Sequence, residues 1–390
     1  MKVLYIAPSL SQQDLTAADT RLRQIIPKLR SAVDLRVVGF HEAHDSVDAH
    51  PLADVIVSKK KISGIQALTG FFSKWPQAFS RYSDPKSKQT LVDVEAEFRP
   101  DIIHFDTFSC VGLARHTTTA RSVFHVHDAI SKKYPGWIKA ERNYLKKFFL
   151  KSQEKKTRFA EQVLFPKSSV CIVDSEEDCD WLIRDTGANV NVIPLGFDES
   201  VYCPEGPTEE LNQNAIVFSG SMGGKQSVDA ARWLYEKVMP TVWQDTPNAR
   251  LYFVGSNPDK IIKDMGDKDD RVHVTGFVES LAMYLRGSAV VVCPLQIGSG
   301  MKTRAIEALA TGCALVTTSV GVLGLPHGEN QAWLEANTPE AFAKSINRLV
   351  KEKALREVLK KSAANYAASK FTWNSTVEKL LQTYQQAMES

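Results

Sequence analysis

The feature that most constrains the fold of this chain is a repeated alternation of short β-branched runs with helix-length amphipathic stretches. Helical periodicity occurs, for example, at residues 21–29, 228–243, 303–311 and 339–352. Strands that alternate with helices predict parallel sheets covered by helices on both faces. The buried-strand patterns lie at residues 3–7, 35–40, 54–57, 102–105, 123–126 and 170–173, and again at 215–218, 250–254, 272–274, 289–292 and 314–317.

The length of the chain and one break in its pattern predict two domains. A chain of 390 residues is longer than a single ordinary core requires. The break is the segment VIPLGFDESVYCPEGP at residues 192–207, where a strand runs into proline, glycine and acidic residues. We therefore expect an α/β protein with two Rossmann-like, doubly wound parallel-sheet domains, residues 1–198 and 199–372, that face a central cleft. Ligands of such sheets bind outside the carboxyl ends of the strands.

The composition excludes several classes of protein. Hydrophobic residues make up 43% of the chain and charged residues 24%, as in an ordinary globular protein. The formal net charge of +3 is too small for a dedicated nucleic-acid binder. No run approaches the roughly twenty apolar residues of a membrane span, and we expect residues 2–7 to form a buried strand rather than part of a signal peptide. The six cysteines lack metal-like spacing, which favours reduced thiols in a cytoplasmic protein.

The segment with the most chemical information is VVVCPLQIGSGMKTRAIEALATGCALVTTS, residues 290–319. A strand pattern ends in a loop with Gly298 and Gly300, and a helix pattern begins near Thr303. Glycines let the backbone approach a ligand closely, and the amides at a helix N-terminus attract phosphate oxygens. Lys302 and Arg304 add positive charge at the same place. A plain helix cap with a solvated basic face would explain the loop alone, but the combination favours phosphate binding.

This segment resembles the retaining glycosyltransferases of GT-B fold, known as group one or family four. Four further segments resemble the family in the expected order: 192–204 its interdomain linker, and 218–234, 251–258 and 272–278 the strands and loops of its donor domain. The final residues, 373–390, resemble the family's last helix, which crosses back to the first domain. The family's glycine, glutamate and small-residue pattern is matched at Gly300, Glu307, Ala308, Ala310, Gly312, Leu315 and Val316.

The resemblance implies roles for individual residues of the donor domain. Lys225 would neutralise the phosphates, Glu307 would hold the ribose hydroxyls, and Phe277 and Val278 would contact the base through backbone groups. The loop and helix start would hold the donor diphosphate through Gly300, Met301, Lys302, Thr303 and Arg304.

Two donor-site positions depart from the family pattern. Ser299 stands where the family often has a glutamate that contacts the transferred sugar, and Ser221 stands where an arginine often follows the glycine. These departures leave the donor sugar open.

In the first domain, the segment FHVHDAIS at residues 124–131 places His127 and Asp128 where a strand is expected to end. The resemblance implies that His127 faces the cleft near the donor sugar once the domains close. The alternative is a capping Asp128 beside a partly buried histidine, and His125 shares the strand parity of His127. The first loop, residues 11–19, has no glycine against the phosphates.

The letters Asp178-Cys179-Asp180 match the Asp-x-Asp pattern that holds a divalent cation in the other large glycosyltransferase fold. They follow a strand pattern, where Ser175 is placed to cap a helix and acids suit the first turn. We therefore assign them to helix capping and expect no metal and no other cofactor. Lys225, Lys302 and Arg304 would supply the positive charge instead.

Residues 132–162 are basic and interleaved with aromatic side chains. A basic amphipathic helix of this kind can dock on an anionic membrane surface. It can equally be a surface helix whose aromatic face packs on the domain while its lysines are solvated. The sequence leaves both interpretations open, the first implying a peripheral location at the inner face of the membrane.

Taken with the resemblance, these residues predict a retaining hexosyltransferase that moves a sugar from a nucleotide sugar to an acceptor hydroxyl in bacterial glycan or glycoconjugate biosynthesis. UDP is favoured over GDP, and the catalytic residues would be His127, Lys225 and Lys302. The acceptor, whether a glycan, a lipid-linked molecule or a small molecule, and the oligomeric state stay open. Two rivals are a nonhydrolysing nucleotide-sugar epimerase and a donor-binding scaffold without turnover, the latter suggested by Ser299.

Overall fold

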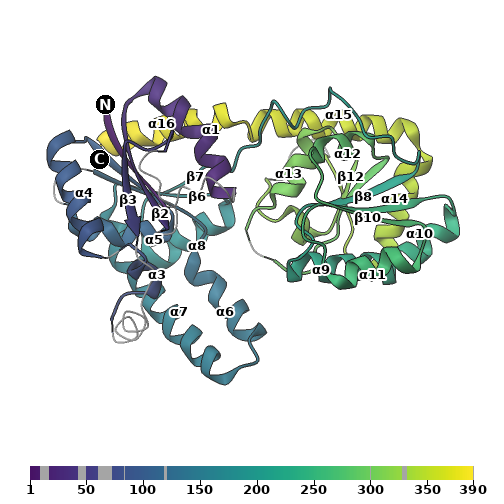
Figure 1. The fold of residues 1–390 in the computed structure, drawn as a ribbon, viewed down its shortest axis with the longest axis horizontal. Helices are drawn as coiled ribbons and strands as arrows, with labels where there is room; N and C mark the ends of the chain where they lie inside the picture. Colours follow the sequence, from purple (N-terminus) through teal and green to yellow (C-terminus); the bar gives the residue numbers. More distant parts are fainter. Residues whose placement is uncertain are drawn as a thin grey trace. The chain divides into compact units, whose positions relative to one another are not determined.

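The computed structural model describes residues 1–8, 17–42, 50–59, 73–82, 84–117, 121–298, 300–326 and 332–389. They form two compact units, which are coloured along the sequence in Figure 1. Unit 1 comprises Met1–Pro194 and Asn374–Ser390, and unit 2 comprises Leu195–Trp373. Most of the first loop, residues 9–16, lies outside the described residues, as does Ser299.

Unit 1 is built on a seven-stranded parallel sheet in the order β3-β2-β1-β4-β5-β6-β7. Its strands are β1 (Lys2–Ala7), β2 (Asp34–Glu42), β3 (Val55–Lys59), β4 (Ile102–Asp106), β5 (Arg121–His127), β6 (Val170–Val173) and β7 (Val190–Val192). Its helices are α1 (Ala17–Ala32), α3 (Gln77–Ser80), α4 (Pro85–Phe98), α5 (Phe108–Val111), α6 (Ile130–Ala140), α7 (Tyr144–Leu164), α8 (Glu176–Thr186) and α16 (Trp373–Glu389).

Unit 2 is built on a six-stranded parallel sheet in the order β10-β9-β8-β11-β12-β13. Its strands are β8 (Ala215–Ser219), β9 (Arg250–Val254), β10 (Val272–Gly276), β11 (Val290–Cys293), β12 (Leu315–Thr317) and β13 (Leu334–Glu335). Its helices are α9 (Lys225–Trp233), α10 (Met239–Asp245), α11 (Lys260–Lys268), α12 (Leu281–Gly287), α13 (Thr303–Ala310), α14 (Pro339–Lys351) and α15 (Lys353–Lys370). The prediction of two doubly wound α/β sheets is confirmed.

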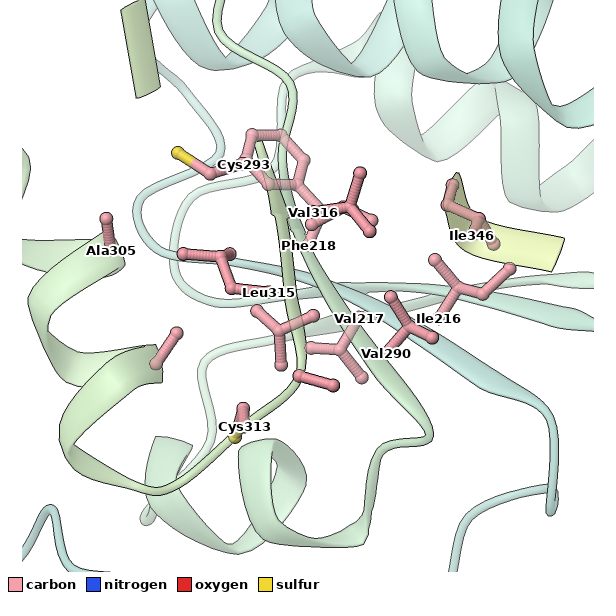
Figure 2. Close-up of a cluster of buried hydrophobic side chains, with 14 of the residues drawn as sticks. Ile216, Val217, Phe218, Val290, Cys293, Ala305, Cys313, Leu315, Val316 and Ile346 are labelled. Atoms are coloured by element: carbon pink, nitrogen blue, oxygen red, sulfur yellow. The ribbon is translucent and has the colours of Figure 1, made fainter. Parts of the chain in front are cut away.

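The central strands are buried on both faces, which explains why they read as continuous apolar runs. Every residue of β4 and of β8 is buried. In Figure 2, Ile216, Val217 and Phe218 of β8 gather with side chains from β11 and β12 and with Ala305 of α13. This packing fixes the ends of β8 and β11 and the start of α13. The loops that contain the glycines come directly after β8 and β11.

Two helix starts follow the capping rules read from the sequence. The Thr338 hydroxyl accepts a hydrogen bond from the backbone N–H of Ala341, with Pro339 in the first turn of α14. The Ser175 hydroxyl likewise accepts from the backbone N–H of Asp178, in a first turn of acidic residues. The prediction that Ser175 caps a helix with acidic residues in its first turn is therefore confirmed.

One predicted helix is interrupted. The periodic stretch 228–243 is α9 and α10 joined by a π-helical turn, Leu234–Val238. Strand β13 is only two residues long, which is too short for a periodic signal.

The last helix, α16, packs on unit 1. The Tyr384 hydroxyl is hydrogen-bonded to Nδ1 of His104 at 2.9 Å, and Thr376 donates to the carbonyl of Pro194 at 3.3 Å. The side chains of Tyr384 and Thr376 are both buried.

The cysteines match the expectation of free, mostly buried thiols: five are buried, Cys203 is half-buried, and all are free. Within the described ranges, no helix has the length and apolar content needed to cross a membrane.

Candidate active site

The carboxyl ends of β4, β5 and β6 in unit 1 carry a buried group of charges, which we call the ion cluster: Arg21, Asp106, His125, His127 and Asp174. Asp106 ends β4, His127 ends β5, and Asp174 follows β6. Arg21 reaches the group from α1. Parallel strands bring these ends to one edge of the sheet, so residues far apart in sequence meet there.

His127 lies between two carboxylates. Its Nε2 is 2.9 Å from Oδ1 of Asp106, and its Nδ1 is 3.1 Å from Oδ1 of Asp174. Burial and the Arg21 guanidinium lower the pKa of His127, but the two carboxylates outweigh them and raise it to about 9. At neutral pH the ring is therefore an imidazolium that donates from both nitrogens.

The backbone at His127 is also unusual, with a φ of 65° in the left-handed region. A non-glycine residue there is strained unless its surroundings hold it. The two hydrogen bonds of the ring keep His127 in this conformation.

Asp106 is fully buried, and its carboxylate is saturated with donors. Tyr5 donates to Oδ2 at 2.8 Å, Arg21 forms an ion pair with the same oxygen, and His127 donates to Oδ1. Although burial raises the pKa of Asp106, the Arg21 guanidinium and His127 hold it well below its usual range. The cluster is therefore a balanced set of two cations and two anions.

The cluster also contains atoms that could face a metal ion. One ligand atom each from Asp106, His125 and His127 lies within 4.8 Å of the others. A cation here would have to displace the protons of His127 and approach the Arg21 guanidinium. These residues therefore fit an ion-paired cluster better than a cation site.

Asp128 does not cap the following helix. The N-cap of α6 is Ala129, which makes no side-chain capping bond, and Asp128 instead forms an ion pair with Lys133 at 2.6 Å. The alternative that Asp128 is a capping residue is therefore wrong, because the helix begins one residue later than capping by Asp128 requires.

In unit 2, the loops after β8 and β9 approach each other as closely as backbones can. A Cβ at Gly255, whose φ is +140°, would lie 2.0 Å from the carbonyl oxygen of Gly220. The N–H of Gly220 donates to the carbonyl of Val254, and the N–H of Gly255 donates to the carbonyl of Gly276. Only glycine fits at Gly255, and it joins the carboxyl ends of three strands at one point.

Arg304, on the first turn of α13, points to the same place. Its Nη2 donates to the Ser227 hydroxyl at 3.1 Å, and its guanidinium lies 5.1 Å from the ring centre of Phe218. A Cβ at Gly220 would lie 3.2 Å from the guanidinium carbon. The other terminal nitrogen, Nη1, is buried and has no hydrogen-bond partner among the described residues.

Lys302 does not point freely into solvent. It is 8% exposed, and its Nζ donates to the carbonyl of Gly300 at 2.8 Å. A Cβ at Gly298 would lie 3.1 Å from that Nζ. Lys302 thus lies close to Gly298 and is hydrogen-bonded to Gly300. Ser299, the position of the family's sugar-contacting glutamate, lies outside the described residues.

Glu307 is half-buried one turn further along α13 and accepts a hydrogen bond from the Tyr202 hydroxyl. Burial raises the pKa of Glu307, against the opposing effects of Tyr202 and Arg304. Burial and Glu307 raise the pKa of Tyr202 well above its usual range. The hydrogen bond from Tyr202 orients the carboxylate that the family resemblance assigns to ribose.

The other residues assigned to the donor site lie on loops of unit 2. Lys225 is exposed as the first residue of α9, and the backbone carbonyl of Ser221 accepts from Ser227 at 2.7 Å. Phe277 is 78% exposed just after β10, whereas Val278 packs against the core. Met301 also packs against the core, and Thr303 is exposed at the start of α13.

The structure brings Arg304, Gly220 and Ser227 together just after β8. Gly298, Gly300 and Lys302 lie close to one another between β11 and α13. Sequence reasoning missed Arg21, Asp106 and Asp174 of the ion cluster and Tyr202 beside Glu307. Asp106 and Asp174 each stand at the end of a buried strand, which is the signal that could have found them.

The chain matches two family models. Residues 22–201 match the model described as Glycosyltransferase Family 4, and residues 213–352 match that described as Glycosyl transferases group 1. An uncharacterized glycosyltransferase of Methanocaldococcus jannaschii is 23% identical over 206 residues, which are 50% of this chain and 51% of that protein. The match thus spans about half the length of this relative.

Solved structures show the same fold over the whole chain. Sucrose-phosphate synthase from Thermosynechococcus elongatus has a TM-score of 0.70 at 17% identity, over 99% of this chain and 98% of its own. The Anabaena protein HepE, in complex with UDP, has a TM-score of 0.66 at 14% identity, over 99% of this chain and 100% of its own. With both halves matched by the family models, the chain belongs to the GT-B-fold glycosyltransferases of group 1 and family 4.

Proposed function

We propose that this protein transfers a sugar from a nucleotide sugar to an acceptor hydroxyl with retention of anomeric configuration. UDP is the favoured nucleotide, a choice supported by the complex of the similar Anabaena protein with UDP. The acceptor class, a role in bacterial glycan biosynthesis and a cytoplasmic location belong to the same proposal.

The observation that carries the proposal is the buried Nη1 of Arg304, which has no hydrogen-bond partner among the described residues and lies beside the backbone of Gly220. A buried guanidinium nitrogen without a partner is costly in a folded protein, and a phosphate oxygen would satisfy it. Arginine suits this task because its planar donors match phosphate oxygens in pairs. Gly220 and Gly255 leave room for the ligand because neither has a side chain.

The chemistry requires that the departing diphosphate be stabilised as its charge grows. Arg304, Lys225 and the amides at the start of α13 would bind it, and Glu307 would accept from the ribose hydroxyls. In the transfer, the bond from the anomeric carbon to the diphosphate oxygen breaks as the acceptor oxygen bonds to that carbon on the same face. The acceptor proton passes to the departing phosphate oxygen.

The ion cluster bears on which group takes that proton. His127 already holds a proton on each ring nitrogen, so it cannot act as a general base in this state. We propose that His127 acts as a cation and that the leaving phosphate is the base. We also propose that no metal is needed, because Arg304, Lys225 and Lys302 supply positive charge at the loops of unit 2.

A ligand screen tests the proposal. Thermal unfolding is measured with UDP, GDP, ADP and dTDP, and with their sugars. A ligand at a hundredfold excess over its dissociation constant adds about 2.7 kcal/mol of stability. We expect a shift with UDP, and a much smaller shift in the Arg304→Ala variant. The absence of any shift with all four nucleotides would contradict the donor site.

Product analysis then tests the reaction. Transfer to an acceptor with retained configuration supports the proposal. Release of a free epimer without any acceptor would indicate an epimerase, and saturable binding without turnover across an acceptor panel would indicate a scaffold.

A further inference from the structure

Helices α6 and α7 form a hairpin that projects from the sheet of unit 1 (Figure 1). Its base is fastened to the unit by polar contacts. Gln153 of α7 accepts from the backbone N–H of Gln77 of α3 at 2.8 Å, and Lys132 of α6 forms an ion pair with Glu177 of α8 at 2.8 Å. Within the hairpin, Glu161 of α7 accepts from the backbone N–H of Ser131 of α6 at 3.0 Å. Beyond this base lie residues 135–151, which we call the hairpin tip.

The hairpin tip exposes large apolar side chains. Tyr144 is 88% exposed, Leu145 81%, Phe148 65% and Trp137 45%. Residues 144, 145 and 148 lie on one turn of α7 and form an apolar patch at the end of the hairpin, while Trp137 is exposed on the neighbouring helix α6. A contiguous apolar patch on a folded protein marks a site of contact with a partner or a membrane.

The apolar turn is a formed helix end and not a frayed one. The Asn143 side chain accepts from the backbone N–H groups of Leu145 and Lys146 at 2.9 and 3.1 Å. The Glu141 carboxylate accepts from the N–H of Asn143 at 2.8 Å. These capping bonds present the apolar side chains in a fixed arrangement before any partner binds.

The charge of the tip selects its partner. Residues 135–151 contain one acidic residue, Glu141, and five basic residues: Lys139, Arg142, Lys146, Lys147 and Lys151. An apolar surface ringed by basic side chains complements a bilayer with anionic headgroups, where lysines reach the phosphates while aromatic rings enter the interface. A second copy of the same tip would be repelled by like charge.

We propose that the hairpin tip docks this protein on an anionic phospholipid bilayer. Trp137, Tyr144, Leu145 and Phe148 enter the interface, and the basic side chains contact the lipid headgroups. This inference goes beyond the proposed transferase activity and does not depend on it. A protein docked in this way would meet acceptors that reside in the membrane.

Vesicle binding by the full-length chain tests the proposal. Co-sedimentation is measured with vesicles of phosphatidylcholine alone and of phosphatidylcholine mixed with phosphatidylglycerol. We expect binding to the mixed vesicles that weakens at least tenfold in two variants, Leu145→Ser/Phe148→Ser and Lys146→Glu/Lys147→Glu. Because all four positions lie on the tip, thermal unfolding should be unchanged in both.

Ile183→Ser is the matched control, since Ile183 is a 47% exposed side chain on α8 of the same unit, in a helix rich in acidic residues. It should bind as the unchanged protein does. Quenching of Trp137 fluorescence by brominated lipid, measured against Trp137→Phe, should report insertion of the tip. Absence of binding to mixed vesicles, or equal binding by the tip variants and the control, would overturn the proposal. So would tip-dependent self-association without vesicle binding.

Discussion

The ion cluster of unit 1 and the glycine loops of unit 2 both lie at the carboxyl ends of parallel strands. They differ in how far their charged side chains are paired with opposite charges. In the cluster, Asp106 is saturated by Tyr5, Arg21 and His127. In the loops, Arg304 donates to one hydroxyl and keeps a buried nitrogen without a partner among the described residues. Nη1 of Arg21 in the cluster also lacks a partner among the described residues, but the charge of Arg21 is paired with the Asp106 carboxylate. Arg304 forms no ion pair within the described part of the chain, so its charge is the one left for an anionic ligand.

The largest effect should come from removing a carboxylate of the ion cluster. Asp106→Ala leaves the Arg21 guanidinium and the His127 ring buried with one carboxylate fewer. Loss of one partner from a buried ion pair costs about 3–5 kcal/mol of unfolding free energy. Chemical denaturation measures it, with Asp264→Ala as control, because Asp264 pairs with Lys260 at the surface. A loss as small as that of the control would mean that the cluster does not stabilise the fold.

The protonation of His127 gives the cluster a pH dependence. Its pKa in the folded protein, about 9, lies above the ordinary value of 6.5. The stabilisation is therefore complete below about pH 6.5 and is lost as the pH rises through about 9, with a total of up to about 3 kcal/mol.

Unfolding free energy measured from pH 6 to about 9.5 checks this expectation. The unchanged protein should lose stability over that range more steeply than His127→Gln. His273→Gln, which removes an exposed histidine of unit 2, should follow the unchanged protein. Parallel curves for the unchanged protein and for His127→Gln would contradict the claim that His127 is an imidazolium in the folded protein.

For the loops of unit 2, we expect a substitution to weaken ligand binding and to leave the stability of the fold unchanged. Arg304→Ala removes charge-assisted hydrogen bonds to phosphate worth about 1.5–3 kcal/mol, or roughly tenfold to a hundredfold in the dissociation constant for the nucleoside diphosphate. Calorimetric titration measures it. Arg232→Ala, an exposed arginine of α9, serves as control. Equal affinity in both variants would remove Arg304 from the donor site.

Glu307→Gln should have a smaller effect on the same affinity. A neutral amide accepts from ribose hydroxyls less strongly than a carboxylate, so we expect a loss of about 0.5–1.5 kcal/mol. The free nucleobase, which lacks ribose, should bind both proteins alike. Glu199→Gln, at an exposed position of the linker, controls for charge. Unchanged nucleotide affinity in Glu307→Gln would count against its contact with ribose.

The smallest effect should follow removal of metal ions. If Arg304 and the lysines of unit 2 supply the positive charge, transfer activity should persist in excess chelator. The reaction rate with and without chelator measures this. Complete loss that manganese or magnesium restores would reopen the question of a cation site, starting with Asp106 and the histidines of the ion cluster.

The sequence by itself determined the two sheets and the places where loops of functional interest begin. Buried strands such as β4 and β8 are recognisable because both faces are covered, so that apolar residues stand at consecutive positions, as in Ile102–Ile103 and Ala215–Phe218. The start of α14 was readable because Thr338 and Pro339 act through their immediate neighbours. The loop at Gly298 and Gly300 was readable for the same reason, since glycine acts through its own backbone.

Only the tertiary structure decided which charges meet. Arg21, Asp106 and Asp174 are far apart along the chain, and no local pattern pairs them with one another. Their meeting depends on the strand order β1-β4-β5-β6, which local periodicity does not encode. The same holds for Lys302, which turns back to Gly300, and for Arg304, because the packing of α13 on β11 and β12 places its guanidinium beside Phe218 of β8. Local patterns fix elements, whereas long-range packing fixes the partners of their side chains.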